Sequence, residues 1–119
     1  KNKKIMVVDD DAKELSKITN FLENKEMNVS GSLFGRDVIE KVANKHNFDL
    51  ILLDDETDTI SAYEVLKELK KNKNFNIPVV IMIDDSKEFI KLHYLQDGFA
   101  DVIMKSKLNQ ELERIIKRF

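Results

Sequence analysis

The chain has 119 residues, of which 42% are hydrophobic and 35% are charged, with three Gly, one Pro and no Cys. This size and composition suit one globular domain and exclude a disordered chain, a collagen-like repeat and a disulfide framework. The formal net charge of -2, from 20 basic and 22 acidic residues, gives no overall positive field for DNA or an anionic membrane surface.

The predicted elements alternate between strand and helix along the chain. The apolar runs at 5–8, 50–53 and 79–83 show no polar alternation, which is typical of strands buried on both faces of a parallel sheet. In chain order we expect a strand at 5–8, a helix at 12–25 with Leu15, Ile18 and Leu22 at helical spacing, a weaker strand at 27–33, a helix with Val38 and Val42, a strand at 50–53, a helix with Val65, Leu66 and Leu69, a strand at 79–83, a helix, a strand at 101–104, and a closing helix with Leu108, Leu112, Ile115, Ile116 and Phe119.

This alternation predicts an α/β fold in which residues 1–119 form one domain. With right-handed crossovers, the expected architecture is a doubly wound five-stranded parallel sheet in the flavodoxin-like order 2-1-3-4-5, with helices on both faces. Because the chain begins with Lys1 instead of Met, we expect it to come from a longer protein.

Acidic residues follow three of the predicted strands. They are Asp9, Asp10 and Asp11 after the first strand, Asp54, Asp55, Glu56 and Asp58 after the third, and Asp84 and Asp85 after the fourth. The carboxyl ends of parallel strands meet at one edge of the sheet, where ligands bind at the topological switch point. The sequence therefore predicts an acidic crevice there.

Converging carboxylates require a positive partner, because two of them about 4 Å apart repel by roughly 4 kcal/mol at an effective dielectric near 20. Oxygen ligands without nearby His or Cys favour a hard divalent ion, and we expect Mg2+. Lys105, after the fifth strand, is expected to enter the same crevice. A metal, a lysine and a carboxylate nucleophile together indicate phosphoryl transfer.

Not every polar residue needs such a role. Asp11 is explained as the N-cap of the helix that follows it. For Asp58, Asp84 and Asp85 we expect a solvated loop, and His46 and His93 are expected on the surface.

These motifs resemble the receiver, or response-regulator, family of two-component signalling over essentially the whole chain. The residues that carry the resemblance are Ile5-Met6-Val7-Val8-Asp9-Asp10-Asp11, Asp49-Leu50-Ile51-Leu52-Leu53-Asp54, Ile77-Pro78-Val79-Val80-Ile81-Met82 and Gly98-Phe99-Ala100-Asp101-Val102-Ile103-Met104-Lys105. Four segments in the family's order and spacing are far more specific than any one of them. The residues around Gly98-Phe99 and the C-terminal segment Leu112-Glu113-Arg114-Ile115-Ile116-Lys117 are most similar to those of receivers fused to hybrid sensor kinases.

The resemblance implies a role for each matching residue. Asp54 would accept a phosphoryl group from the phosphohistidine of a histidine kinase or phosphotransfer domain. Asp10 and Asp54 would bind Mg2+ directly with the Glu56 backbone carbonyl, and Asp9 would act mostly through water. Lys105 would hold the phosphoryl oxygens.

The resemblance also implies a cytoplasmic signalling domain that catalyses only its own phosphorylation and dephosphorylation. Within a hybrid histidine kinase, the parent chain would be a kinase. Its output domain or protein partner would dock on the fourth helix, fifth strand and fifth helix, without direct contact to nucleic acid or membrane.

The switch positions depart from the family. The usual Thr or Ser at the end of the fourth strand is Ile83, the usual aromatic residue three before the lysine is Val102, and the Pro after it is Ser106. The loop after Asp54 also lacks the common Pro-Gly and Asp-Gly pattern, and Glu56 adds a carboxylate that could repel an incoming phosphoryl group or alter hydrolysis.

Three alternatives follow from the residues. Ile83 and Val102 favour a phosphorylation-independent pseudo-receiver that acts as an interaction module. The run Asp9-Asp10-Asp11 imitates the nucleophile motif of haloacid-dehalogenase-like phosphatases, but Lys13 is atypical and the chain has no room for a cap domain. A flavodoxin would need a phosphate-cradling loop of Ser, Thr and Gly where this chain is acidic.

Overall fold

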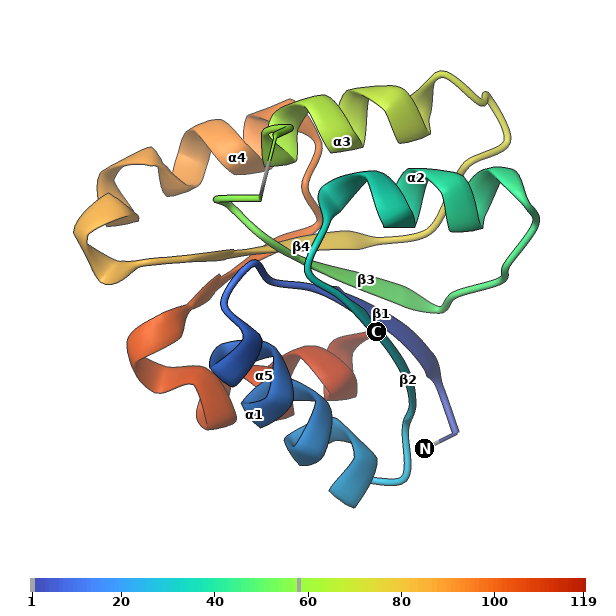
Figure 1. Ribbon diagram of the computed structural model, residues 1–119. Coiled ribbons are helices and arrows are strands. Elements are labelled where there is room, and N and C mark those ends of the chain that lie inside the picture. The colour runs from blue at the N-terminus through green and yellow to red at the C-terminus, as the bar shows by residue number, and fades with distance from the viewer. Residues whose placement is uncertain (1, 58) are drawn as a thin grey trace.

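The chain forms three layers, with a parallel sheet between two groups of helices (Figure 1). A computed structural model describes residues 2–57 and 59–119, so the predicted loop residue Asp58 lies outside the described residues. The elements are β1 (Lys4–Val8), α1 (Ala12–Asn24), β2 (Asn28–Ser32), α2 (Gly35–Ala43), β3 (Leu50–Asp54), α3 (Ala62–Lys70), β4 (Val79–Ile83), the 3-10 helix η1 (Asp85–Ile90), α4 (Lys91–Asp97), β5 (Asp101–Met104), the 3-10 helix η2 (Lys105–Lys107) and α5 (Leu108–Arg118).

The predicted fold class and strand order are confirmed. The sheet has five strands in the order β2-β1-β3-β4-β5, and every neighbouring pair is parallel. Apart from the two short 3-10 helices η1 and η2, which were not predicted, the differences lie at the ends of elements. The first helix ends at Asn24, because Lys25 is its C-cap, and the edge strand β2 is one residue shorter at each end than predicted.

The sheet buries a separate apolar core on each face, as its alternating side chains require. Met6 and Val8 of β1 face α2 and α3, whereas Ile5 and Val7 face α1 and α5. In Figure 1, α2, α3 and α4 accordingly lie above the sheet and α1 and α5 below it. Each CH2 group buried on either face contributes roughly 0.8 kcal/mol to the stability of the fold.

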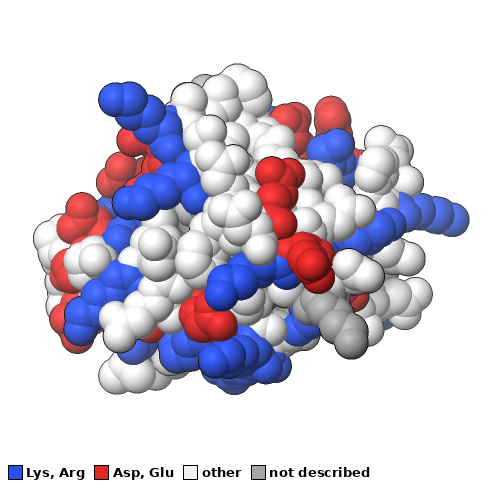
Figure 2. Space-filling model, turned by 90° about the horizontal axis from the view of Figure 1, so that it is seen from below, with Lys and Arg blue, Asp and Glu red and all other residues white. Residues whose placement is uncertain are grey.

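The face seen from below the sheet carries charges of both signs (Figure 2). Viewed from below the sheet, Lys and Arg side chains alternate with Asp and Glu side chains across the visible face (Figure 2). Within the described residues, no helix is long and apolar enough to cross a membrane.

The strand register brings the acidic segments together. Val8 pairs with Leu53 and Asp54 pairs with Met82, so β1, β3 and β4 end at the same edge of the sheet. Asp9 follows β1 directly and Asp54 is the last residue of β3. The fold therefore places the carboxylates in one crevice, as the sequence predicts.

Candidate functional site

An acidic pocket of about 500 Å3 opens at the carboxyl edge of the sheet. Its lining residues carry eight carboxylates and a single lysine, and they are Asp9, Asp10, Asp11, Glu14, Asp54, Glu56, Asp84, Asp85, Lys105 and Ser106. The excess of negative charge makes the pocket attractive to a cation.

Asp9 and Asp54 form the buried floor of this pocket, with side chains almost wholly removed from solvent. One Asp9 oxygen, Oδ1, accepts a hydrogen bond of 2.9 Å from the Asp11 backbone N–H. The other, Oδ2, is buried and has no hydrogen-bond partner among the described residues. A buried carboxylate oxygen without a partner is costly, which favours a bound cation or a proton.

Burial governs the protonation of both acids in the metal-free protein. It raises the pKa of Asp9 to about 8, and the neighbouring carboxylates of Glu14 and Asp54 act in the same direction. Burial also raises the pKa of Asp54 to about 7, although its contact with Lys105 opposes the shift. Positive charge in the pocket is therefore required to keep both carboxylates ionised at neutral pH.

Lys105 is the positive charge that the chain itself supplies. It follows β5 as the first residue of η2, and its Nζ forms an ion pair with Asp54 Oδ1 and a second with Glu14 Oε1 at 3.0 Å. Burial opposes its charged form, but the contacts with both carboxylates dominate and raise the pKa of Lys105 above its usual value. The predicted meeting of Lys105 with the acidic residues is observed.

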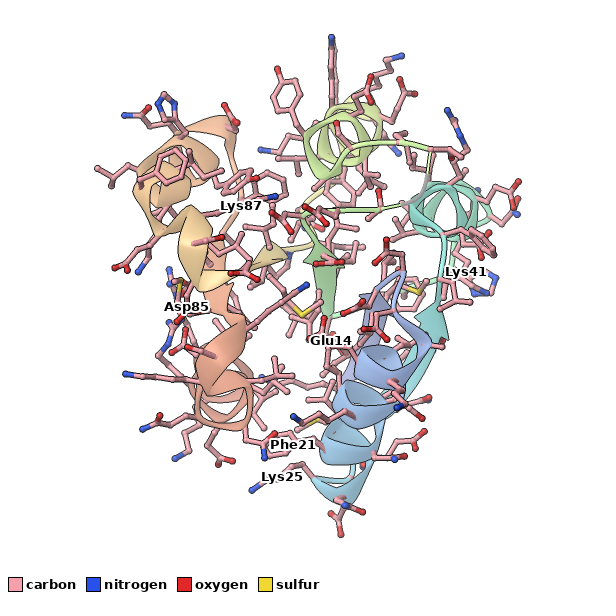
Figure 3. All side chains as sticks on the ribbon, turned by 60° about the vertical axis from the view of Figure 1, so that its left-hand side comes forward. Glu14, Phe21, Lys25, Lys41, Asp85 and Lys87 are labelled. Atoms are coloured by element: carbon pink, nitrogen blue, oxygen red, sulfur yellow. The ribbon has the colours of Figure 1, made fainter. Side chains whose placement is uncertain are left out.

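Glu14 is a pocket residue that the sequence reasoning missed. It lies in the first turn of α1, with the Asp11 side chain accepting hydrogen bonds from the Lys13 and Glu14 backbone N–H groups, so the predicted N-cap is observed. In Figure 3, Glu14 lies beside the end of β3, across the site from Asp85 and Lys87. An acidic residue at the third helical position was the available signal.

The donor atoms fit a small divalent cation. One carboxylate oxygen from each of Asp9, Glu14 and Asp54 lies within 4.8 Å of the others, and all are hard oxygen ligands. Asp10 lines the pocket but is exposed and lies outside this trio. The expected direct ligation by Asp10, and by the Glu56 backbone carbonyl, stays a prediction.

Lys87 is a second residue that the sequence reasoning missed. Its Nζ lies 3.0 Å from Asp55 Oδ2 and 2.9 Å from Glu56 Oε2. The hydrogen bond with Lys87 lowers the pKa of Glu56, so the exposed Glu56 carboxylate is ionised but paired. The additional negative charge expected beside Asp54 is thus partly neutralised.

Asp84 and Asp85 are exposed, as predicted, but Asp85 is the first residue of the 3-10 helix η1 and not part of a loop. Asp84 caps η1 by accepting a hydrogen bond of 3.0 Å from the Ser86 backbone N–H. Asp85 accepts from the Ser106 hydroxyl group and, at 3.3 Å, from the Ser106 backbone N–H. The contact joins the segments that follow β4 and β5.

The two atypical positions lie within the core. Ile83 and Val102 are fully buried in the apolar cluster between the sheet and the upper helices. Neither presents a hydroxyl or an aromatic ring to the pocket. His46 and His93 are exposed, as predicted.

The chain was compared with known protein families, and one family model matches nearly its whole length. The response regulator receiver domain matches residues 5–117 of the chain. The autoinducer 2 sensor kinase/phosphatase LuxQ of Vibrio vulnificus (strain YJ016) is 27% identical over 116 residues, covering 98% of this chain and 13% of that protein. The rice two-component response regulator ORR7 is 26% identical over 115 residues, covering 96% of this chain and 55% of that protein. The chain therefore spans only part of the length of these relatives.

Solved structures agree with this match. The receiver domain of Francisella response regulator 1452 superposes with a TM-score of 0.87 at 26% identity, covering 98% of this chain and 95% of that one. The receiver domain of sensor histidine kinase PA1611 from Pseudomonas aeruginosa has a TM-score of 0.86 at 22% identity, covering 99% and 97%, and was solved with a magnesium ion coordinated in its active site cleft. At that identity, the second likeness shows the fold alone.

Proposed function

The chain belongs to the response regulator receiver domain family of two-component systems, and we propose that its Asp54 accepts a phosphoryl group from a phosphohistidine. The observation that carries this proposal is the buried Asp54 carboxylate at the end of β3, paired with Lys105 beside the unpartnered Asp9 Oδ2. The site combines a carboxylate nucleophile with the ammonium of Lys105 and a group of carboxylate oxygens that could hold a divalent cation, which suits phosphoryl transfer.

In the proposed reaction, an Asp54 oxygen attacks the phosphorus of the donor phosphohistidine. A P–O bond to Asp54 forms while the P–N bond breaks, and the electron pair of that bond returns to the donor imidazole. The Lys105 ammonium contacts the phosphoryl oxygens and offsets their charge. Mg2+, if held by Asp9, Asp10, Asp54 and the Glu56 backbone carbonyl, would supply further positive charge in the pocket.

Asp54 has to be ionised to act as the nucleophile. Burial disfavours that state and raises the pKa of Asp54 to about 7, even with Lys105 beside it. The Lys105 ion pair counteracts burial and holds the Asp54 carboxylate toward the pocket. Placing Asp54 at the end of a rigid central strand fixes its position without help from a flexible loop.

Similarity to response regulators and to a sensor kinase supports a proposal for the wider context of the domain. We propose that residues 1–119 are one receiver domain of a longer cytoplasmic protein, and that a histidine kinase or phosphotransfer domain is its phosphoryl donor. In this proposal the domain turns over no separate substrate. The output partner would dock on α4, β5 and α5, without direct contact to nucleic acid or membrane.

A second candidate function is a pseudo-receiver that binds partners without phosphorylation. The residue types Ile83 and Val102 favour it, because neither side chain has a hydroxyl or an aromatic ring that could respond to a phosphoryl group. Partner binding would then be independent of Asp54.

Beryllofluoride binding followed by NMR tests the proposed function, because beryllofluoride mimics an aspartyl phosphate. We expect saturable, Mg2+-dependent shifts near Asp54 and Lys105 that disappear in Asp54→Asn. The matched control is Asp97→Asn, which removes the same charge from an exposed residue at the end of α4. No binding by the wild-type chain at millimolar Mg2+ would favour the pseudo-receiver.

A further inference from the structure

Glu14 departs from the ordinary behaviour of an acidic residue in the first turn of a helix. A Glu at this position often returns to the backbone N–H of the N-cap residue and completes a capping box. Here the Asp11 N–H donates instead to Asp9 Oδ1 at 2.9 Å. The Glu14 carboxylate is therefore available to turn toward the pocket, where Oε1 contacts Lys105 Nζ at 3.0 Å.

The Glu14 contact is protected from solvent. The Glu14 side chain is 25% exposed and the Lys105 side chain is 22% exposed, so the pair is screened less than a surface ion pair. The same ammonium also pairs with Asp54 Oδ1. Lys105 thus joins the first turn of α1 to the end of β3, and Glu14 shares in fixing where its charge lies.

The Glu14 charge acts in opposite directions on a cation and on an anion. One of its oxygens lies within 4.8 Å of oxygens of Asp9 and Asp54, so a divalent cation among them gains attraction from Glu14. A phosphoryl group on Asp54 is anionic and is repelled by the same carboxylate. It must also share, or take over, the Lys105 ammonium that Glu14 contacts.

We propose that Glu14 is a positioning residue that holds Lys105 and competes with the phosphoryl group for it, favouring cation binding over phosphoryl binding. This inference rests on the proposed function, because it assigns Lys105 to the phosphoryl oxygens. Glu14 would then set a threshold: the pocket takes up its cation readily, whereas an acyl phosphate must first weaken the Glu14–Lys105 pair.

The decisive variant is Glu14→Gln, which removes the charge while keeping the length of the side chain. By isothermal titration with MgCl2 alone, we expect the Mg2+ dissociation constant to rise roughly three- to tenfold. At saturating Mg2+, we expect the beryllofluoride dissociation constant to fall by roughly the same factor. A merely structural role would weaken both ligands together, so the opposite signs are diagnostic.

Two further variants distinguish the effect of the Glu14 charge from the effect of its contact with Lys105. Glu23→Gln removes an exposed carboxylate near the other end of α1 and should leave both affinities unchanged. Glu14→Asp keeps the charge but shortens the side chain and withdraws it from Lys105. We expect its Mg2+ affinity to stay within about twofold of wild type, with a beryllofluoride affinity between those of wild type and Glu14→Gln.

The outcomes distinguish this inference from the proposed function. If the wild type binds beryllofluoride and Glu14→Gln binds it equally or more weakly, the role of Glu14 is wrong and the phosphoacceptor stands. If neither protein binds it, the phosphoacceptor and the competition both fail. Binding by Glu14→Gln but not by the wild type would support the competition directly.

Discussion

Lys87 and Asp55 form an ion pair of 3.0 Å between Nζ and Oδ2, joining η1 to the loop that follows β3. The Asp55 side chain is only 3% exposed, whereas Glu56, the second partner of Lys87, is 71% exposed. The two contacts therefore differ in strength, because solvent screens the Glu56 pair far more than the Asp55 pair. The Asp55 pair anchors η1 beside the acidic pocket.

Replacing Lys87 with Met should destabilise the fold by about 1–2 kcal/mol, because the buried Asp55 carboxylate loses its positive partner. We expect the loss as a lower urea midpoint at neutral pH, measured by circular dichroism. Lys71→Met is the matched control, since the Lys71–Glu68 pair has exposed fractions of 66% and 42%. Equal effects of the two substitutions would show that the Asp55 contact is no stronger than a surface pair.

Stability should fall with rising pH in the metal-free protein. Burial raises the pKa of Asp54 to about 7 and that of Asp9 to about 8, from an ordinary value of 3.8. Between the unfolded and folded pKa values the folded state binds more protons than the unfolded state, so the free energy of unfolding decreases as pH rises through that window. Above the folded pKa values the decrease is complete.

Urea midpoints at about pH 5, 6, 7 and 8 would measure this slope. Saturating Mg2+ should flatten it, since a cation favours the ionised carboxylates, and Asp54→Asn should remove part of it. A midpoint that rises over the same interval without metal would contradict the assigned proton uptake by Asp9 and Asp54.

The sequence predicted the fold well because its signals are local and repeated. The runs at 5–8, 50–53 and 79–83 are apolar at every position, which only strands covered on both faces require. The ends of elements were less predictable, since the last hydrogen bonds of a helix decide them. At Lys25, the backbone N–H bonds to Leu22 and Glu23 carbonyls, and the helix ends one residue early.

The site residues also divide into those that the sequence pattern predicts and those that depend on contacts between distant segments. Asp9, Asp54 and Lys105 were predictable because the ends of parallel strands determine where they lie. Glu14 and Lys87 project from helical turns, and their direction depends on which partner lies across the pocket. Glu14 turns inward only because Lys105, 91 positions later in the sequence, reaches it. An acidic residue at the third helical position makes Glu14 a candidate, but the spacing does not show that its side chain meets Lys105.

Replacing Lys105 with Gln should change the affinities of the pocket for Mg2+ and for beryllofluoride in opposite directions. Lys105 is the one basic side chain among the described lining residues, and its loss leaves Asp54 and Glu14 without their ammonium partner. We expect beryllofluoride affinity to fall by at least about tenfold, while Mg2+ affinity rises several-fold. Titration of both ligands measures this, with the exposed neighbour Lys107→Gln as control. Unchanged beryllofluoride binding would remove Lys105 from the phosphoryl contact.

Substitutions of Ile83 test whether this pocket still has room for the hydroxyl that most of the family carries at the end of the fourth strand. Its side chain is fully buried in the upper apolar cluster. Ile83→Val deletes one methyl group and should cost about 0.5–1.5 kcal/mol. Ile83→Thr should cost about 1–3 kcal/mol more, because its hydroxyl would be buried among apolar side chains.

Chemical denaturation of both Ile83 variants, with and without Mg2+ and beryllofluoride, measures the comparison. Without ligand, we expect Thr to be the less stable variant. If the two are equally stable without ligand, the Thr hydroxyl has found a polar partner and the buried position of Ile83 does not forbid the usual switch. If Ile83→Thr becomes as stable as Ile83→Val only when beryllofluoride is bound, the hydroxyl reaches the phosphoryl mimic. The chain would then lack only that hydroxyl, and not the geometry that uses it.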